Sequence, residues 1–259
     1  MMLTVGSLFS GIGGIELGLE RTGGFKTIWQ AEIEPFPAYQ ILPKHWKDVP
    51  NIGDVTKGRW LQYERPDLLC GGFPCQPVSF IGQKQAQRDP RWLWPMFSEA
   101  IRVLRPCYIL VENTPGLLNA GMGDVLADLA SLGYDAEWQS LSAAAFGATH
   151  IRERVFIVAY PFGITESQAY STSITIGTKQ DPWDDVGWFS GAERPTPVLV
   201  FRDNPPEPDW SVYQSGVIGV DDGIPYRVDR AKSLGNAVVP QVTQWIGEQI
   251  LRFDKEVSH

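Results

Sequence analysis

The sequence is poor in the residues that stabilise small secreted proteins or hold metal ions. Its 259 residues include three cysteines and three histidines, with no Cys-x-x-Cys pair. This excludes a disulfide framework and predicts a reducing compartment and no metal site. No apolar run approaches the roughly 18 residues of a membrane-spanning helix, and the N-terminus lacks the charged and apolar regions of a signal peptide. We therefore expect a soluble, cytoplasmic protein with no membrane partner.

Basic residues are also scarce, with 22 Lys and Arg against 30 Asp and Glu and a net charge of −8. Taken alone, this balance argues against a nucleic-acid partner. The deficit is uneven, however, because residues 161–226 carry ten acidic and three basic side chains, whereas residues 1–160 carry 16 and 14. Two short stretches, 84–105 and 227–232, are basic. The overall charge therefore does not exclude nucleic acid as a partner of the first 160 residues.

Short apolar runs alternate with amphipathic stretches over residues 1–160, which predicts an α/β fold with a mixed, mostly parallel sheet and helices on both faces. Strands are expected at residues 3–9, 27–32, 67–71, 108–112 and 155–160, and helices at 14–20, 36–42, 94–103 and 123–132. Residues 161–226 are rich in Pro, Gly, Ser, Thr and Trp and predict an irregular or β-rich insert. From residue 231 the apolar spacing is helical again, and we expect this segment to pack back on the sheet.

A glycine-rich turn follows the first expected strand, where residues 7–14 have the sequence SLFSGIGG. Glycines let a ligand approach the backbone, and the helix that follows offers free N–H groups. Glu16 stands in place of the last glycine of the dinucleotide fingerprint, which disfavours a dehydrogenase. Glu32 and Asp54 end the next two segments, where carboxylates can bind ribose hydroxyls. Together these features predict a nucleoside pocket, although an ordinary turn and solvated acids would have the same sequence.

Cys75 lies in a loop that follows a buried strand and is flanked by Pro74 and Pro77. A loop stiffened by two prolines presents a side chain in a fixed direction, so Cys75 is a candidate nucleophile. Cys70 and Cys107 are expected to be inert thiols of the core.

Three further residues complete a candidate reaction centre. Glu112 ends an apolar strand, where burial would raise its pKa and let it act as an acid. Arg152 and Arg154 alternate in an extended segment, so both side chains lie on one face. Each feature on its own would also fit an ordinary ion pair.

Taken in order along the chain, these motifs resemble the cytosine-C5 DNA methyltransferases, in particular their compact phage and prophage branch. The resemblance rests on FSGIGG at 9–14, GFPCQP at 72–77, ENTPGLL at 112–118, IRERVFIVA at 151–159 and LGNAVVP at 234–240. DPR at 89–91 and PYRVDR at 225–230 are typical of the phage branch. One departure is Ser7, which stands where many members have Asp.

The resemblance implies a DNA (cytosine-5-)-methyltransferase that uses S-adenosyl-L-methionine. The Cys75 thiolate would add to C6 of a cytosine flipped out of double-stranded DNA. Glu112 would hydrogen-bond N3 and the exocyclic amine, and Arg154, helped by Arg152, would hold O2. The implied cofactor residues are Phe9, Gly11, Ile12, Gly14, Glu32, Asp54, Pro74 and Asn236. The candidate DNA contacts are Gln76 and Ser79 of the cysteine loop and four arginines of the two basic stretches, Arg88, Arg91, Arg227 and Arg230.

Three parts of the chain are expected on this basis: a catalytic and cofactor-binding domain at 1–160, a small target-recognition region at 161–226 and a returning segment at 227–259. We also expect a monomer and, because the recognition region is small, a short target sequence. Two alternatives stay open, a tRNA cytosine-5 methyltransferase with the same reactive residues and a catalytically silent nucleic-acid-binding relative.

Overall fold

The computed structural model describes residues 2–74, 92–148, 150–163, 203, 205–206 and 227–257. Cys75, Gln76, Ser79, Arg88 and Arg91 lie outside the described residues, as does most of the expected target-recognition region at 161–226. Arg227 and Arg230 are described as part of a helix, without their side chains. The remaining expected site residues all fall within the described part of the chain.

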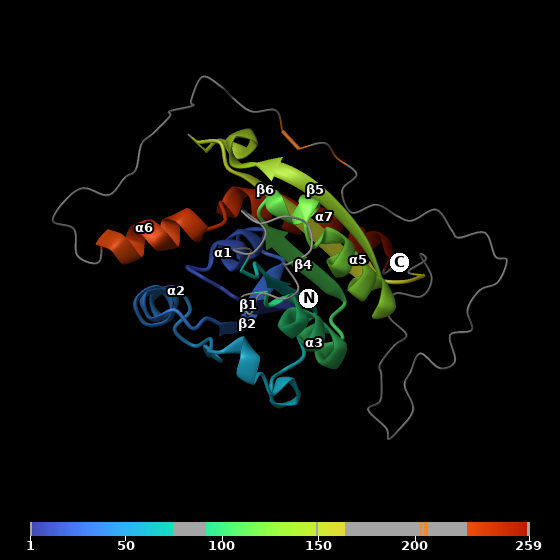
Figure 1. The fold of residues 1–259 in the computed structure, drawn as a ribbon, viewed down its shortest axis with the longest axis horizontal. Coiled ribbons are helices and arrows are strands. Elements are labelled where there is room, and N and C mark those ends of the chain that lie inside the picture. The colour runs from blue at the N-terminus through green and yellow to red at the C-terminus, as the bar shows by residue number, and fades with distance from the viewer. Residues whose placement is uncertain are drawn as a thin grey trace.

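A six-stranded sheet forms the centre of the protein, as Figure 1 shows. Its strands are β1 (Leu3–Leu8), β2 (Phe25–Ala31), β3 (Leu68–Gly71), β4 (Tyr108–Asn113), β5 (Tyr134–Ser142) and β6 (Glu153–Pro161). The order across the sheet is β2-β1-β3-β4-β6-β5. The first four strands are parallel, and β6 runs antiparallel to both β4 and β5. The predicted mixed, mostly parallel sheet is confirmed.

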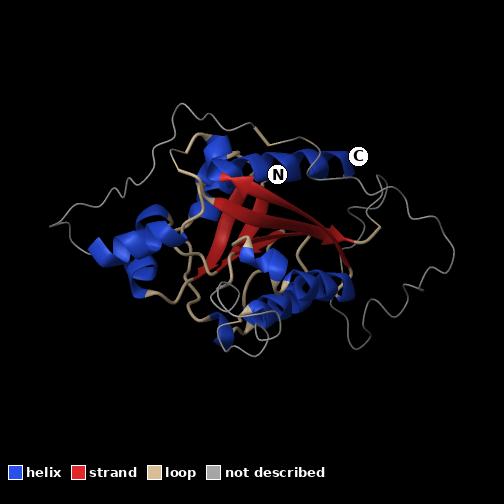
Figure 2. Cartoon of the chain, turned by 45° about the horizontal axis from the view of Figure 1, so that its top comes forward, coloured by secondary structure: helices blue, strands red, loops and turns tan. Residues whose placement is uncertain are grey.

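Helices cover both faces of this sheet, as Figure 2 shows. On one face, α1 (Gly14–Arg21) and α7 (Pro240–Val257) share a buried cluster with Val5 and Leu110 of the strands. On the other face, α3 (Trp94–Leu104) and α5 (Met122–Ser131) pack on Leu8 and Val111. Alternate strand residues feed the two clusters because successive side chains of a strand point to opposite faces. Burial on both faces explains why the central strands β1, β3 and β4 are mostly apolar.

The edge strand β5 was not predicted from the sequence, which assigned no strand there. Its nine residues, YDAEWQSLS, are mostly half-exposed, and only Tyr134 and Leu141 are buried. It is held instead by nine residue pairs with β6, from Tyr134 opposite Pro161 to Ser142 opposite Glu153. Backbone pairing, which no side-chain pattern records, therefore defines this strand.

The observed helices differ from the predicted ones in two places. The helix expected at 36–42 is a π-helical turn at Pro37–Ile41 followed by α2 (Leu42–His45). The C-terminal helix is two helices, α6 (Arg227–Asn236) and α7, separated at residues 237–239. Pro240 has no backbone N–H to donate, so a helix can begin at this residue but cannot run through it. The remaining short elements are α4 (Gly116–Asn119) and the 3₁₀ turns at Val55–Lys57, Trp60–Gln62 and Ala143–Phe146.

Close packing of α7 against α1 requires a glycine at position 18. A Cβ there would collide with the side chain of Thr243 and the carbonyl of Pro240, and would lie 2.8 Å from the backbone nitrogen of Gln244. We expect Gly18→Ala to lower the free energy of unfolding by about 1–3 kcal/mol through overpacking. Urea unfolding measures this loss.

Gly123 provides the matched control, because it is also a helical glycine but a Cβ there would meet nothing within 4 Å. We expect Gly123→Ala to leave stability unchanged or to raise it by up to about 1 kcal/mol. Equal losses for the two alanine variants would contradict this account of the packing between α1 and α7.

Among the helices that the structure describes, none combines the length and the apolar composition needed to span a bilayer.

Candidate active site

The glycine-rich turn between β1 and α1 has an unusual backbone. Phe9, Gly11 and Gly13 all have left-handed conformations, with φ of 54°, 55° and 83°. Such a turn persists only where its surroundings hold it. Ser10 N donates to the carbonyl of Ala31 at 3.1 Å, and Gly13 N donates to the carbonyl of Ser10 at 2.9 Å. The turn is therefore tied to the carboxyl end of β2.

Glu32 follows β2 and reaches back to this turn. One carboxylate oxygen, Oε2, accepts a hydrogen bond from Gly11 N at 2.6 Å, and Oε1 accepts one from Glu34 N at 2.6 Å. Asn51 fixes the backbone of Glu32 from the other side, with bonds of 2.9 and 3.0 Å. Burial raises the pKa of Glu32, opposed by the two backbone N–H groups. The sequence placed the turn and this carboxyl at one sheet edge, and the structure joins them directly.

Asp54 has a different local role. Its Oδ1 accepts hydrogen bonds from Thr56 N at 2.9 Å and Thr56 Oγ1 at 2.7 Å, and its Oδ2 lies 3.5 Å from Lys57 Nζ. These hydrogen bonds hold the pKa of Asp54 below its usual value. Asp54 therefore caps the 3₁₀ turn at Val55–Lys57. The segment itself lies beside β2 through a bridge between Gln30 and Asn51.

The C-terminal segment returns to the glycine-rich turn. Gly14 packs directly against the carbonyl of Val238, and Thr243 Oγ1 donates to the carbonyl of Gly14 at 3.2 Å. Asn236 lies exposed at the end of α6, two residues before this contact. The structure thus brings the segment of Asn236 to the start of α1, as expected.

Glu112 and Arg154 form an ion pair at the carboxyl end of β4. Arg154 Nε lies 2.9 Å from Glu112 Oε1, and their side chains are 19% and 11% exposed. The strands that carry them, β4 and β6, are neighbours in the sheet, with Glu112 opposite Phe156. Burial raises the pKa of Glu112, and the charges of Arg154 and Arg152 oppose that rise without cancelling it. Burial therefore makes the carboxyl of Glu112 easier to protonate than that of an exposed glutamate, the direction that its place at a strand end predicts.

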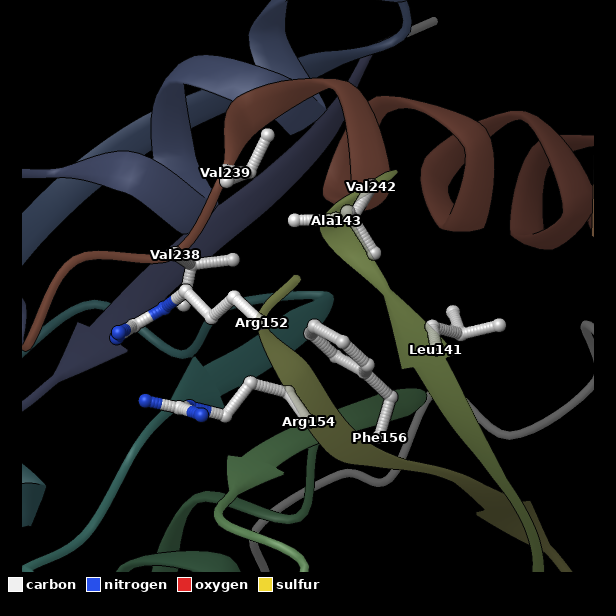
Figure 3. Close-up of a pocket in the computed structure, with 8 residues that line it drawn as sticks. All are labelled: Leu141, Ala143, Arg152, Arg154, Phe156, Val238, Val239 and Val242. Atoms are coloured by element: carbon white, nitrogen blue, oxygen red, sulfur yellow. The ribbon is translucent and has the colours of Figure 1, made fainter. Parts of the chain in front are cut away.

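Arg152 and Arg154 extend side by side from the same strand end, as Figure 3 shows. Both line a pocket together with Leu141, Ala143, Phe156, Val238, Val239 and Val242. Arg152 Nη1 donates to the carbonyl of Gly235 at 2.6 Å, whereas its Nε and Nη2 are buried without a partner in the described structure. Burial and the charge of Arg154 both lower the pKa of Arg152. Arg152 therefore links the candidate reaction centre to the C-terminal segment.

Two residues that the sequence did not single out position the start of the cysteine loop. Asn113 Nδ2 donates to the carbonyl of Phe73 at 3.1 Å, which fixes the chain two residues before Cys75. A Cβ at position 72 would lie 2.6 Å from Glu112 Oε2. Cys75 itself is not described, but these contacts bring the chain that leads to it against Glu112. The sequence signals for these two residues were an asparagine directly after Glu112 at the end of a buried strand, and the two consecutive glycines at 71 and 72.

The glycine at position 72 is expected to be required for the reaction. In Gly72→Ala the new methyl group must displace the carboxyl of Glu112 or shift the backbone before Phe73. Because a misplacement of about 1 Å can cost about a hundredfold in rate, we expect a loss of that order in kcat. A single-turnover assay of the methyl transfer that the resemblance implies measures this loss, and a variant with the parent's rate would contradict the close approach of Gly72 to Glu112.

The residues present fit a nucleoside cofactor. A Cβ at Gly11 would meet nothing within 4 Å, so the outer side of the turn is open. The adjacent carboxyl of Glu32 is of the kind that accepts ribose hydroxyls. Burial raises the pKa of both described thiols, Cys70 and Cys107, which disfavours their thiolate forms. Over the described ranges, no cluster of three His, Cys, Asp or Glu side chains could hold a metal ion.

Comparison with known proteins identifies the family. Residues 3–181 match the family model of the C-5 cytosine-specific DNA methylases. The type II methyltransferase M.MspI of Moraxella sp is 35% identical over 160 residues, which cover 59% of this chain and 37% of that enzyme. The type II methyltransferase M2.BsuMI of Bacillus subtilis strain 168 is 30% identical over an alignment 297 residues long, which takes in 96% of this chain and 75% of that enzyme.

The fold has a solved counterpart. The methyltransferase EhMeth of Entamoeba histolytica matches with a TM-score of 0.67 at 18% identity, over 99% of this chain and 100% of that chain. At this identity the likeness shows the fold alone. The match to M.MspI spans little more than a third of that enzyme's length. The family match extends over more than half of the chain, from the glycine-rich turn through the Glu112–Arg154 pair, and the chain therefore belongs to the C-5 cytosine-specific DNA methylases.

Proposed function

We propose that this protein is a DNA (cytosine-5-)-methyltransferase that transfers a methyl group from S-adenosyl-L-methionine to C5 of a cytosine flipped out of double-stranded DNA. The observation that carries the proposal is the buried Glu112–Arg154 pair, which lies against Gly72 at the start of the cysteine loop. A base inside the duplex cannot reach a buried acid at a strand end, so the target base must leave the stack.

Glu112 and Arg154 divide the recognition of the base between them. The neutral carboxyl of Glu112, favoured by burial, donates a hydrogen bond to N3 and accepts one from the exocyclic amine. Arg154 carries donors only, and it holds O2 and offsets the negative charge that develops on the ring. Arg152 reinforces this charge from the neighbouring position.

Cys75 supplies the nucleophile. Its thiolate forms a bond to C6 while Glu112 supplies a proton to N3, which makes C5 electron-rich. S-adenosyl-L-methionine, when bound, supplies the electrophilic methyl group. A base then removes the proton from C5, the bond between C6 and sulfur breaks, and N3 returns its proton to the Glu112 carboxylate, which releases 5-methylcytosine and the thiolate. Covalent catalysis of this kind requires a thiol that can ionise, unlike those of Cys70 and Cys107.

The cofactor is held along the turn between β1 and α1. Phe9, Gly11, Ile12 and Gly14 provide the surroundings of its methionine and adenine groups, and Glu32 accepts the ribose hydroxyls. Asp54, Pro74 and Asn236 form the rest of the lining of the cofactor site. The buried carboxyl of Glu32, bonded to Gly11 N, supports this assignment.

The rest of the chain binds DNA. Residues 161–226 form the target-recognition region between the catalytic domain at 1–160 and the returning segment at 227–259, and their small number favours a short target sequence. Gln76 and Ser79 of the cysteine loop contact the flipped nucleotide and its surroundings. Arg88, Arg91, Arg227 and Arg230 contact phosphates.

We expect Arg88→Ala and Arg91→Ala to weaken DNA binding at every sequence. Each phosphate that an arginine no longer neutralises should reduce the slope of log K against log salt by about 0.9. Fluorescence anisotropy over a salt series, with target and non-target duplexes, measures both the affinity and the slope. Unchanged affinity and slope would remove these two arginines from the DNA path.

Transfer of a labelled methyl group from S-adenosyl-L-methionine to duplex DNA and to tRNA tests the proposal as a whole. The proposal predicts labelled 5-methylcytosine in duplex DNA. Label in tRNA alone would assign the tRNA reaction instead, and label in neither polymer would contradict the enzyme. Bisulfite sequencing of the product then gives the target, and methylation confined to a site of six or more base pairs would contradict a short one.

A further inference from the structure

A second carboxyl, that of Glu16, lies beneath the glycine-rich turn and has no part in the reaction proposed above. It belongs to the first turn of α1 and is fully buried. Its Oε1 accepts a hydrogen bond at 3.1 Å from Nε2 of Gln30, a buried residue of β2. Its Oε2 is buried and has no hydrogen-bond partner in the described part of the chain. An ionised carboxylate left in this position would be costly, which calls for an explanation of why a glutamate is here.

The surroundings of Glu16 are polar and uncharged. The hydroxyls of Ser7, on β1, and Ser10, in the turn, act to lower the pKa of Glu16, but burial dominates and raises it. Ser10 Oγ also lies 3.0 Å from Ser7 Oγ. A neutral carboxyl has one O–H donor and retains acceptors, so it can join a network of hydroxyls and an amide in which no charge is stranded.

This network supports the turn at its most strained point. Ser10 lies between Phe9 and Gly11, both of which have left-handed backbones. Ser10 of the turn is bonded to Ser7 of β1, and Glu16, in the first turn of the helix that follows, is bonded to Gln30 of β2. The next residue, Gly11, donates its N–H to Glu32, the proposed ribose ligand. A change in the network would therefore reach the cofactor site through one residue.

We propose that Glu16 is a positioning residue for S-adenosyl-L-methionine, whose buried carboxyl, together with Ser7, Ser10 and Gln30, holds the turn at residues 9–13 in its binding conformation. The inference rests on the proposed function for the identity of the cofactor.

Calorimetric titration of the full-length protein and its variants with S-adenosyl-L-methionine tests this role. Loss of a buried hydrogen-bonding group leaves its partners unsatisfied, so we expect Glu16→Leu to raise the Kd by about tenfold to a hundredfold. Glu16→Gln keeps the shape and both hydrogen-bonding functions and is expected to rescue binding to within about threefold of the parent. Ser10→Ala, a smaller change, is expected to weaken binding by about fivefold, as the net value of one hydrogen bond implies.

Asp128 of α5 is the control for the loss of a carboxyl elsewhere in the fold. Its Oδ2 accepts a hydrogen bond from Trp94 Nε1 at 2.7 Å, on the face of the sheet opposite to α1. Asp128→Leu is expected to lower the Tm while leaving the Kd unchanged. Equal weakening by Asp128→Leu and Glu16→Leu would overturn the inference, because it would show a general loss of structure.

The remaining outcomes are distinct. If Glu16→Leu does not fold, Ser10→Ala decides, and a Ser10→Ala protein with the parent's Kd overturns the inference. A Glu16→Gln protein that binds as weakly as Glu16→Leu also overturns it. If the parent itself does not bind S-adenosyl-L-methionine, the proposed function fails, whereas a parent that binds and variants that match it remove only the role of Glu16.

Discussion

Glu112→Gln is expected to lower kcat by about 10²–10⁴-fold, the usual contribution of a general acid. The amide can still accept a hydrogen bond from Arg154 and can still donate one to the base, so base binding is expected to persist. It cannot give a proton to N3, which the attack of the thiolate requires. Single-turnover methyl transfer, combined with anisotropy measurements of DNA affinity, separates the two effects. A variant that retains the parent's rate would exclude Glu112 as the acid.

Glu99 provides a matched control for this substitution. It is paired with Arg102 on the exposed face of α3 at 2.6 Å, and that hydrogen bond lowers its pKa. Glu99→Gln therefore removes a carboxylate and an ion pair of similar length without touching the site. An exposed pair contributes about 0–1 kcal/mol, so this variant is expected to keep both its fold and its rate.

The pH dependence of kcat follows from the direction of the Glu112 pKa. Burial raises this pKa, so the protonated form persists to higher pH than in an ordinary glutamate. Activity that requires the protonated form is fully present below this pKa and falls as the pH rises through it. The thiolate of Cys75 requires the opposite trend, so the profile is expected to be bell-shaped. In Glu112→Gln the fall at high pH should disappear.

Cys75→Ser is the substitution with the second large expected effect. A hydroxyl is a far weaker nucleophile than a thiolate at neutral pH, and the ring of cytosine does not accept a methyl group at C5 before C6 is attacked. We expect methyl transfer to fall by at least about 10³-fold, with the affinity for S-adenosyl-L-methionine unchanged. Radiolabel incorporation into duplex DNA and calorimetric titration of the cofactor measure the two quantities.

Cys107→Ser is the control for the loss of a thiol. Cys107 is half-buried and burial raises its pKa, so its thiolate is disfavoured and the proposed mechanism gives it no role. This variant should keep the parent's rate. If Cys75→Ser were as active as Cys107→Ser, the covalent mechanism would be wrong.

The fold was largely predictable because most of its strands are buried on both faces. The strands β3, β4 and β6 contain uninterrupted apolar runs of three to seven residues, and β1 and β2 are rich in apolar and β-branched residues. The edge strand β5 was missed because half of its side chains face solvent and its pairing with β6 is made by the backbone. The interruption between α6 and α7 was missed because apolar spacing continues across it, although Pro240 was a usable signal.

The site was predictable as far as strand ends and local motifs reach. Parallel strands bring their carboxyl ends to one edge, which placed Glu32 beside the glycine-rich turn and Glu112 near the cysteine loop. Contacts between distant segments were not predictable. The bond from Arg152 to Gly235 spans 83 residues, and no pattern near either residue records it. The cap made by Asp54 was readable, since Asp and Thr two residues apart commonly form such a turn.

Covalent trapping on duplex DNA with 5-fluorocytosine at the target position tests the central claim most directly. Fluorine at C5 cannot leave as a proton does, so the bond between Cys75 and C6 is retained after methyl transfer. The account predicts a protein–DNA adduct that survives denaturation, requires S-adenosyl-L-methionine and is absent from Cys75→Ser. No adduct with the parent on DNA that it methylates, or an equal adduct with Cys75→Ser, would contradict it.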